Sequence, residues 1–579
     1  MKIRQDDNGQ DAKGLTLEGF IQFIKDYAKQ DIRSVIIGLR SCGFDVFMER
    51  VYPRDFSSFE DITWTVCQYE ALIRYGNILA SKLNCSPLKI SPNEIYLTET
   101  HLASEDFKSL QSLSIEDIRA HYAILVSFNQ MIENYLLPLV DFRCAGVYPH
   151  SIANYISRGR NLIFYEIKSS ILRKYLNASH QRNPEHAPPE ISLDPVEEIG
   201  NTNHDVCFTL FSQALNQLSE IQSSQMNVTV AFGGDPQYPF NIKMQGEEVL
   251  GNSGSFRHFM SCMVEQLQSS TINLLVPYKG TGSFTGRYFL KPGPMNYGEE
   301  KMLQFFGQLL GISLRSGIPI ALNMMPTFWR TFVKQPFKSW RECKDLDPVT
   351  YLYLQNLKTV SEENFVSLLE DNDYPKFTYH ALTGELVELC PNGSDIDLDW
   401  DNRTEYINNV KSLKLKEWQS QERMNHILAG VATLVPLLFI QNTFNAEDAE
   451  IQFCGQSFVD LKFLKSHTIY QVGILEDDPH VVHFWSALES FSQAELGKFI
   501  KFACNQDRIP MKGPDESSQI PPYPMKLAPP DNKDGDPDQK FIRVETCMFM
   551  IKLPRYTTLQ IMKEKLLYAI SCALDPLSG

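Results

Sequence analysis

Residues 545–570 read ETCMFMIKLPRYTTLQIMKEKLLYAI and combine a strand-like, a turn and a helical pattern. It starts inside a strand-like segment, residues 541–553, which ends at a Leu-Pro pair. Thr557 and Gln560 then form a capping-box pattern that predicts the start of a helix. Apolar residues follow at helical spacing and predict its buried stripe: Leu559, Met562, Leu566 and Ile570. A strand, a turn and a helix are therefore expected around Cys547.

Cys547 is the candidate nucleophile of this stretch, because a thiol at a strand end beside a turn can be exposed. The thiolate attacks, and at an ordinary pKa of about 8.5 only a few per cent of a thiol is ionised at neutral pH. That fraction is enough for exchange between thioesters, but peptide hydrolysis normally recruits a paired histidine. No histidine lies near Cys547 in the sequence. A purely structural cysteine is the alternative that these residues alone leave open.

Composition and charge set the class of protein. The 579 residues allow three to five units of about 100–200 residues each. Hydrophobic residues make up 43% and charged residues 21%, which excludes bulk disorder, collagen-like repeats and a coiled-coil rod. The net charge of −16 gives no electrostatic reason to bind nucleic acid or anionic lipid. We expect basic partners and no nucleic acid.

Hydropathy and cysteine spacing indicate the compartment. The longest apolar run, 427–440, is interrupted and shorter than the roughly 20 residues of a membrane span, so no membrane insertion is expected. The polar N-terminus has no signal-peptide core. No two of the twelve cysteines are three apart, so no zinc or redox pair is predicted. We expect a cytoplasmic or nuclear chain with reduced thiols, no metal and no cofactor.

The first part of the chain, residues 1–176, is predicted to be a helical leader. Asp7, Asp11 and the run 14–20 loosely resemble the second half of an EF-hand. The closing position falls near Gly19 and has no bidentate glutamate, so a degenerate, metal-free helix pair is favoured over a calcium site. Residues 177–229, rich in proline and polar residues at first, are predicted to be a linker that leads into the next domain.

The remaining chain is predicted to form two further parts, 230–473 of mixed character and 474–579 of compact α/β character. Within an apolar helix expected at 297–316, Gly307 and Gly311 lie four residues apart. Polar and charged residues in this segment argue against a membrane dimer motif and favour close helix packing in a core.

From residue 472 onward the sequence resembles the C-terminal lobe of the HECT-type ubiquitin ligases. The segments that carry the resemblance are residues 483–510 and 545–570, with upstream matches at 240–259, 305–320, 386–410 and 451–473. The residues of the last stretch that match position by position are Thr546, Cys547, Leu553, Pro554, Tyr556, Lys565, Leu566, Ala569 and Ile570. The resemblance, over about 230–579, implies a mostly helical α+β, bilobal domain: a large, mainly α N-lobe and a smaller α/β C-lobe.

The resemblance implies that Cys547 accepts ubiquitin from a conjugating enzyme (E2) as a thioester and passes it to a lysine of a protein substrate. Its neighbours Thr546 and Glu545 are further candidate site residues. The family often has His at the position of Glu545, and a carboxylate there would raise the pKa of the thiol or attract an incoming lysine ammonium. The family's Phe-Asn after the cysteine is Met548-Phe549 here. Cys504 is interpreted as structural.

The resemblance also implies an E2-binding subdomain within the N-lobe, at about 345–406. The candidates for its apolar groove are Leu352, Leu354, Tyr374, Phe377 and Tyr379. The alternative for each is a place in the internal core of the subdomain. The lobes of the family swing about a short hinge, which would be Tyr470, Gln471, Val472 and Gly473, with glycine supplying backbone freedom.

Two alternatives to a ligase remain at this point. A catalytically weak scaffold would keep the fold for protein binding, which the changes at Glu545 and Met548 favour slightly and the retained Thr-Cys pair disfavours. The second alternative is a cysteine hydrolase, but the sequence shows no signature of such an enzyme and no evident histidine partner for the cysteine. The helical leader is either a substrate-recruiting scaffold or a brace for the large lobe.

Overall fold

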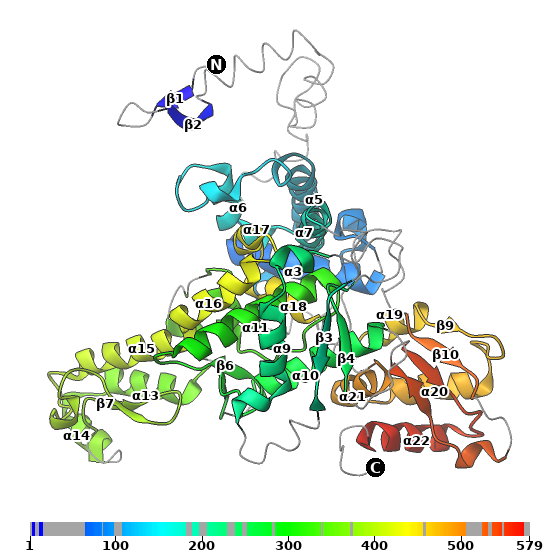
Figure 1. The fold of residues 1–579 in the computed structure, drawn as a ribbon. Coiled ribbons are helices and arrows are strands. Elements are labelled where there is room, and N and C mark those ends of the chain that lie inside the picture. Colours follow the sequence, from blue (N-terminus) through cyan, green and yellow to red (C-terminus); the bar gives the residue numbers. More distant parts are fainter. Residues whose placement is uncertain are drawn as a thin grey trace, which may run out of the picture. The chain divides into compact units, whose positions relative to one another are not determined.

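The structure is a computed structural model, drawn as a ribbon in Figure 1. It describes residues 3–5, 11–15, 64–83, 85–97, 107–180, 188–195, 205–228, 238–245, 252–280, 284–335, 337, 340–344, 346–370, 375–455, 459–504, 524–530, 535–546 and 549–572. Over these residues the chain is mostly helical, with one four-stranded and four two-stranded sheets, which confirms the mostly helical α+β class. No helix within these ranges is long and apolar enough to cross a bilayer.

The chain divides into two compact units. The first consists of Met1–Val140 with Leu162–Phe164, and the second of Asp141–Asn161 with Tyr165–Gly579. The predicted leader is therefore not one body, because its last 36 residues, apart from Leu162–Phe164, belong to the second unit. In the first unit, helices α3 (Val66–Leu83) and α5 (Ile115–Met131) pack together, and the Tyr122 hydroxyl donates to the Pro87 carbonyl at 2.9 Å.

The extreme N-terminus forms a strand pair where an EF-hand-like start was predicted. Strand β1 (Ile3–Gln5) pairs antiparallel with β2 (Asp11–Leu15). Asp11 and Gly14 thus lie on extended backbone. Asp7 and most of the predicted helix pair lie outside the described residues.

The second unit begins with two helices of the predicted leader, α6 (Ile152–Arg158) and α7 (Tyr165–Ala178). In α7 the Lys168 ammonium lies 2.5 Å from the Asp448 carboxylate of helix α18 (Ala446–Cys454), and both side chains are buried. Arg160, just before α7, donates to the carbonyls of Val333, Gln441 and Phe444. Buried charge pairs and backbone contacts of this kind make α7 an integral part of the second unit.

The predicted linker at 177–229 contains ordered elements. Strand β3 (Glu190–Leu193) pairs parallel with β4 (Asn241–Met244), and helix α9 (Leu210–Ser219) packs on β3. The Gln217 side chain bonds both the N–H and the carbonyl of Ser192, which ties the helix to the strand. Helix α10 (Asn252–Leu267) follows and packs on β4 and α9. Long-range packing thus orders a stretch whose composition predicted a linker.

The centre of the second unit is the crossing of α11 (Tyr297–Ser316) and α16 (Gln421–Ala432). A Cβ atom on Gly307 would meet the Ile427 carbonyl oxygen at 1.9 Å, and one on Gly430 would meet the Gln304 oxygen at 1.9 Å. The two helix backbones therefore touch at reciprocal glycines, which confirms the predicted close packing in a core.

Further elements surround this crossing. They are the antiparallel pair β5 (Leu275–Pro277) and β6 (Tyr288–Leu290) and the helices α12 (Pro326–Phe332), α15 (Arg403–Gln419) and α17 (Leu437–Thr443). A smaller subdomain has its own core and holds α13 (Pro348–Thr359), α14 (Glu362–Glu370) and the hairpin β7 (Thr378–His380) and β8 (Leu386–Glu388). The start of α15 contributes Tyr406 and Val410 to that core.

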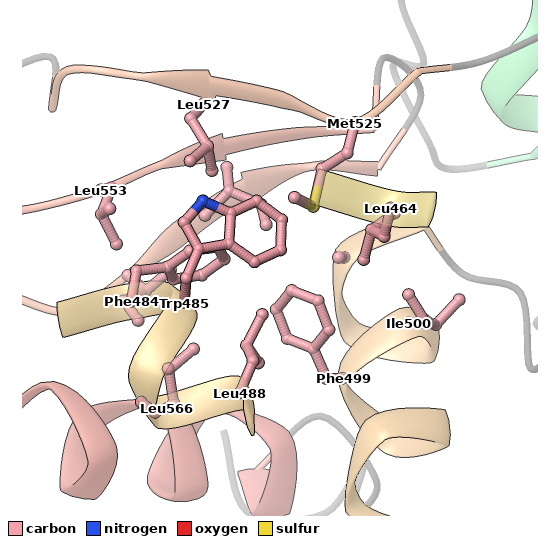
Figure 2. Packing of buried hydrophobic residues seen from close by; sticks show 14 of the residues in the cluster. Leu464, Phe484, Trp485, Leu488, Phe499, Ile500, Met525, Leu527, Leu553 and Leu566 are labelled. Carbon is pink, nitrogen blue, oxygen red and sulfur yellow. The ribbon is translucent and has the colours of Figure 1, made fainter. Parts of the chain in front are cut away.

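The C-terminal part has its own core, part of which Figure 2 shows around Trp485. Its helices are α19 (Leu461–Ser466), α20 (Pro479–Glu489), α21 (Gln493–Cys504) and α22 (Leu559–Cys572). Its strands are β9 (Ile469–Tyr470), β10 (Lys526–Ala528), β11 (Arg543–Glu545) and β12 (Met550–Lys552), in the sheet order β11-β12-β10-β9. The β10 strand runs parallel to both β9 and β12, and β11 runs antiparallel to β12.

The sequence analysis expected the C-terminal part to begin at residue 474, but its core begins upstream of that residue. Its first buried member is Val459, whose N–H and carbonyl both bond the Gln493 side chain of α21. Phe453, in contrast, packs on Trp329 of α12 in the preceding core. The chain therefore passes from one core to the other between Phe453 and Val459.

Candidate functional site

The candidate site lies at the edge of the C-terminal sheet, where β11 leads to β12. The two strands pair Arg543 with Lys552 and Glu545 with Met550. Cys547 and Met548 lie outside the described residues, so the structure describes the site through the residues on either side of them. The N–H of Phe549 donates to the carbonyl of Thr546 at 3.3 Å. The chain therefore turns back on itself between the two described flanks of Cys547.

Phe549 anchors the far side of this turn. Its side chain is buried in the C-terminal core, and its carbonyl accepts the N–H of Lys526 at 2.8 Å. Its φ of +49° lies in the left-handed region, which bulky residues rarely adopt. A strained backbone persists where surrounding contacts over-determine it, and strain of this kind clusters at functional sites. The burial of the Phe549 ring is the contact that holds it here.

Glu545 forms an ion pair across the hairpin. Its carboxylate lies 2.6 Å from the Lys552 ammonium, with the glutamate side chain 42% and the lysine side chain 18% exposed. A nearby carboxylate would raise the pKa of a thiol, and a nearby cation lowers it. The lysine therefore offsets the effect predicted for Glu545 alone. Sequence analysis missed Lys552, whose relevance follows from the strand register.

Thr546 also contacts a distant helix. Arg257 of α10 donates from Nη2 to the Thr546 carbonyl at 2.8 Å, and the arginine is only 2% exposed. Arg257 lies in the segment 240–259 that matches the family, but sequence analysis gave it no role. Its partner is 289 positions away, and no local pattern connects the two residues.

Two buried cysteines of the described part, Cys504 and Cys343, are poorly placed for attack. Cys504 is buried and its Sγ bonds the Ile500 carbonyl at 3.3 Å, in keeping with its structural interpretation. Burial raises the pKa of Cys343 to about 11, which leaves almost no thiolate at neutral pH. Among the described residues, no group of three or more His, Cys, Asp or Glu side chains is arranged to hold a metal ion.

The five residues predicted for the apolar groove of the subdomain are not placed alike. Leu352 is 58% exposed on α13, whereas Leu354 and Phe377 are each 2% exposed in the internal core, the alternative stated for them above. Tyr379 packs beside that core, and its hydroxyl shares a hydrogen bond of 3.0 Å with that of Thr350. Tyr374 lies outside the described residues. Val349, one turn before Leu352, is also exposed, and helical spacing is the signal that identifies it.

Comparison with known proteins places the chain in a family. The family model described as HECT-domain (ubiquitin-transferase) matches residues 261–575, which is more than half of the chain. The chain belongs to the HECT family. The matched range includes the core of the smaller subdomain, the C-terminal core, Cys547 and both of its described flanks.

Three relatives place the chain more closely. It is 43% identical to the human probable E3 ubiquitin-protein ligase HECTD4 over 98% of the chain and 15% of that protein. It is 26% identical to human HERC2 over 71% of the chain and 8% of that protein. It is 24% identical to HACE1 of Danio rerio over 57% of the chain and 35% of that protein. The HECT chain thus spans a small share of each of these E3 ubiquitin-protein ligases.

The four residues predicted as the hinge of the HECT domain lie at the C-terminal sheet. Tyr470 belongs to β9 and its hydroxyl accepts the Trp485 Nε1–H at 3.2 Å, and the Gln471 N–H donates to the Leu527 carbonyl. Val472 is 98% exposed, and Gly473 has the positive φ of +95° that glycine adopts readily. The Gly473 carbonyl accepts from Arg555 at 3.2 Å. All four residues are thus attached to, or next to, the C-terminal sheet.

Proposed function

We propose that this chain acts as an E3 ubiquitin ligase, with Cys547 as the residue that carries ubiquitin. The observation that carries the proposal is the match to the ubiquitin-transferase family over a range that includes Cys547. The names of the relatives, E3 ubiquitin-protein ligases, agree with it. Ubiquitin, an E2 and a protein substrate are then the partners.

The proposed chemistry has two steps. The Cys547 thiolate attacks the carbonyl carbon of the E2–ubiquitin thioester, and the E2 thiolate leaves. A deprotonated lysine amine of the substrate then attacks the new thioester, the Cys547 thiolate leaves, and an isopeptide bond forms with loss of one proton. The first step exchanges one thioester for another, so it requires mainly positioning. The compensated charge of Glu545 beside Lys552 supports a thiolate at this edge of the sheet.

We further propose the bilobal arrangement in finer detail. The larger lobe ends near Phe453 and the smaller lobe begins at Val459, so the connection between the lobes, and its swing, would lie upstream of Tyr470. The exposed face of α13 around Val349 and Leu352 would contact the E2. An exposed apolar pair on a small separate core suits a partner contact better than the buried Leu354 does.

A ubiquitin-loading assay on the 579-residue chain tests the proposal. The chain is mixed with activating enzyme, a panel of E2 enzymes, ATP and ubiquitin, and the products are separated with and without reducing agent. We expect an adduct of ubiquitin size that reducing agent removes and that Cys547→Ala abolishes. The control variants, Cys504→Ala and Cys207→Ser, should keep it, since Cys504 is buried and structural and Cys207 is exposed elsewhere. A folded chain with no adduct across the panel would favour the scaffold alternative.

A further inference from the structure

Two donors converge on the carbonyl directly before Cys547. The Phe549 N–H belongs to the turn itself, and Nη2 of Arg257 comes from α10, 289 residues away in the sequence. The connection from Glu545 to Phe549 is called the Cys547 loop below. From this geometry we propose that Arg257 is a positioning residue, which holds the Cys547 loop on the larger lobe while ubiquitin passes to the substrate lysine. The proposal rests on the function proposed above and adds a residue and a step to it.

An arginine suits this task. Its guanidinium is always charged and presents several donors in a rigid plane, and hydrogen bonds from a charged donor are stronger than neutral ones. At 2% exposure the Arg257 side chain has little freedom to move away from its partner. The Thr546 carbonyl is part of the peptide group that ends in the Cys547 nitrogen. A bond of 2.8 Å to that carbonyl therefore restrains the backbone directly before Cys547, and the burial of Phe549 holds the described backbone that follows.

A second contact joins the same helix to the smaller lobe. Lys501 of α21 pairs with Glu265 of α10 at 3.1 Å. Glu265 lies eight residues after Arg257, a spacing that belongs to one broad helix face. The helix α10 is thus the surface of the larger lobe on which the smaller lobe rests in this structure.

The position of α10 indicates which of the two proposed steps the Arg257 bond serves. It packs on β4 and α9, whereas α13, which carries the proposed E2 contact, packs on α15. A loop bonded to α10 is therefore held at a different part of the larger lobe from the E2-binding subdomain. Loading from the E2 must then precede this bond or break it, and the bond serves the second step. In that step the guanidinium does not react: it orients the thioester that the lysine amine attacks, and misplacement by about 1 Å can cost 100-fold in rate.

The test separates loading from discharge. The 579-residue chain is loaded with ubiquitin, the E2 is then blocked, and the Cys547 thioester is chased with free lysine in a single turnover. We expect Arg257→Met to lower the discharge rate at least tenfold while the loading rate stays within twofold of wild type. Arg257→Lys should restore part of the discharge rate, since a lysine keeps the charge and can donate one hydrogen bond. Arg257→Gln, a milder neutral change, provides the comparison if the methionine variant folds poorly.

Arg423→Met is the matched control. Arg423 is equally buried, and it too donates to backbone carbonyls, those of Gly293 and Pro294, within the larger lobe. If loss of a buried arginine only reduces the amount of folded protein, loading and discharge fall together in Arg423→Met. The selective loss of discharge is expected in the Arg257 variants and not in this control. Unchanged discharge in a folded Arg257→Met or Arg257→Gln variant overturns the proposal, as does an equal loss of loading and discharge. Absence of any adduct in the wild type would overturn the proposed function instead.

Discussion

Two lysine–carboxylate pairs of nearly equal length occupy opposite kinds of environment. Lys168 and Asp448 lie 2.5 Å apart in the interior of the second unit, with side-chain exposures of 1% and 9%. Lys552 and Glu545 lie 2.6 Å apart beside the Cys547 loop, with exposures of 18% and 42%. The first pair joins two helices 280 residues apart, and the second joins neighbouring strands.

Burial, more than distance, decides what these two charge pairs do. Burial lowers the pKa of Lys168, and the Asp448 carboxylate opposes that shift. Asp448 also accepts the N–H of Asn445 in the capping box of α18, so its charge has fixed partners on two sides. The pair beside Cys547 is open to water, which weakens its attraction but leaves it able to act on a nearby thiol.

The largest expected effect comes from breaking the buried pair. Lys168→Met leaves the Asp448 carboxylate buried without its cation, and we expect a loss of about 3–5 kcal/mol in the free energy of unfolding. Urea denaturation of the purified chain measures it. Lys552→Met is the matched control, with an expected loss of about 0.2–1 kcal/mol. Equal losses in the two variants would contradict the role given to burial.

The next effect concerns the glycine crossing in the same interior. Gly430→Ala places a methyl group against the Gln304 carbonyl of α11, which is backbone and cannot move aside as a side chain can. We expect a loss of about 1–3 kcal/mol or more from overpacking. Gly497→Ala in α21 is the control, because a Cβ atom there meets nothing within 4 Å and alanine favours helix. A thermal shift in Gly497→Ala as large as that in Gly430→Ala would argue against a backbone contact.

The smallest effect on stability, but one with a chemical readout, comes from the exposed pair. Lys552→Gln leaves the Glu545 charge beside the Cys547 loop uncompensated, which raises the pKa of the thiol. We expect alkylation of Cys547 by iodoacetamide at neutral pH to slow by about two- to fivefold, the range that matches an exposed charge pair. Peptide mass spectrometry measures the fraction of Cys547 that is alkylated over time.

The reverse change serves as the control for the exposed pair. Glu545→Gln should speed alkylation by removing the negative charge, and the double variant should return close to wild type. Slower alkylation in both single variants would show that the pair acts through the shape of the loop instead of through its charge.

Local patterns accounted for the elements around the site, with small errors. The strand, turn and helix of residues 545–570 are present, yet the cap of α22 comes from Thr558, whose hydroxyl accepts the Ile561 N–H. Thr557, the predicted cap, bonds Asp538 instead. Only Thr557 has a glutamine three residues later, yet the approach of Asp538 occupies its hydroxyl and leaves Thr558 as the cap.

Local patterns also could not separate exposed from buried residues in the predicted apolar groove. Leu352 and Leu354 are two residues apart on one helix, and their residue type does not tell which of them faces the core. Helical rotation puts them on different faces, and the packing of α13 on α15 buries Leu354 and leaves Leu352 exposed. The predicted linker failed for a related reason, since partners distant in the sequence order β3.

The helical class, the close packing at Gly307 and the elements around Cys547 were predictable from local patterns, because periodicity, small residues and turn residues act over a few positions. The meeting of charged groups was not predictable in this way. Lys168 with Asp448, Glu545 with Lys552 and Arg257 with the Thr546 carbonyl each depend on chain segments brought together by burial and strand pairing. A hydrogen bond or ion pair needs its partners within about 3 Å, and no local spacing encodes the 280 and 289 residues that separate the first and the last of these pairs. The register of β11 on β12 brings Glu545 near Lys552.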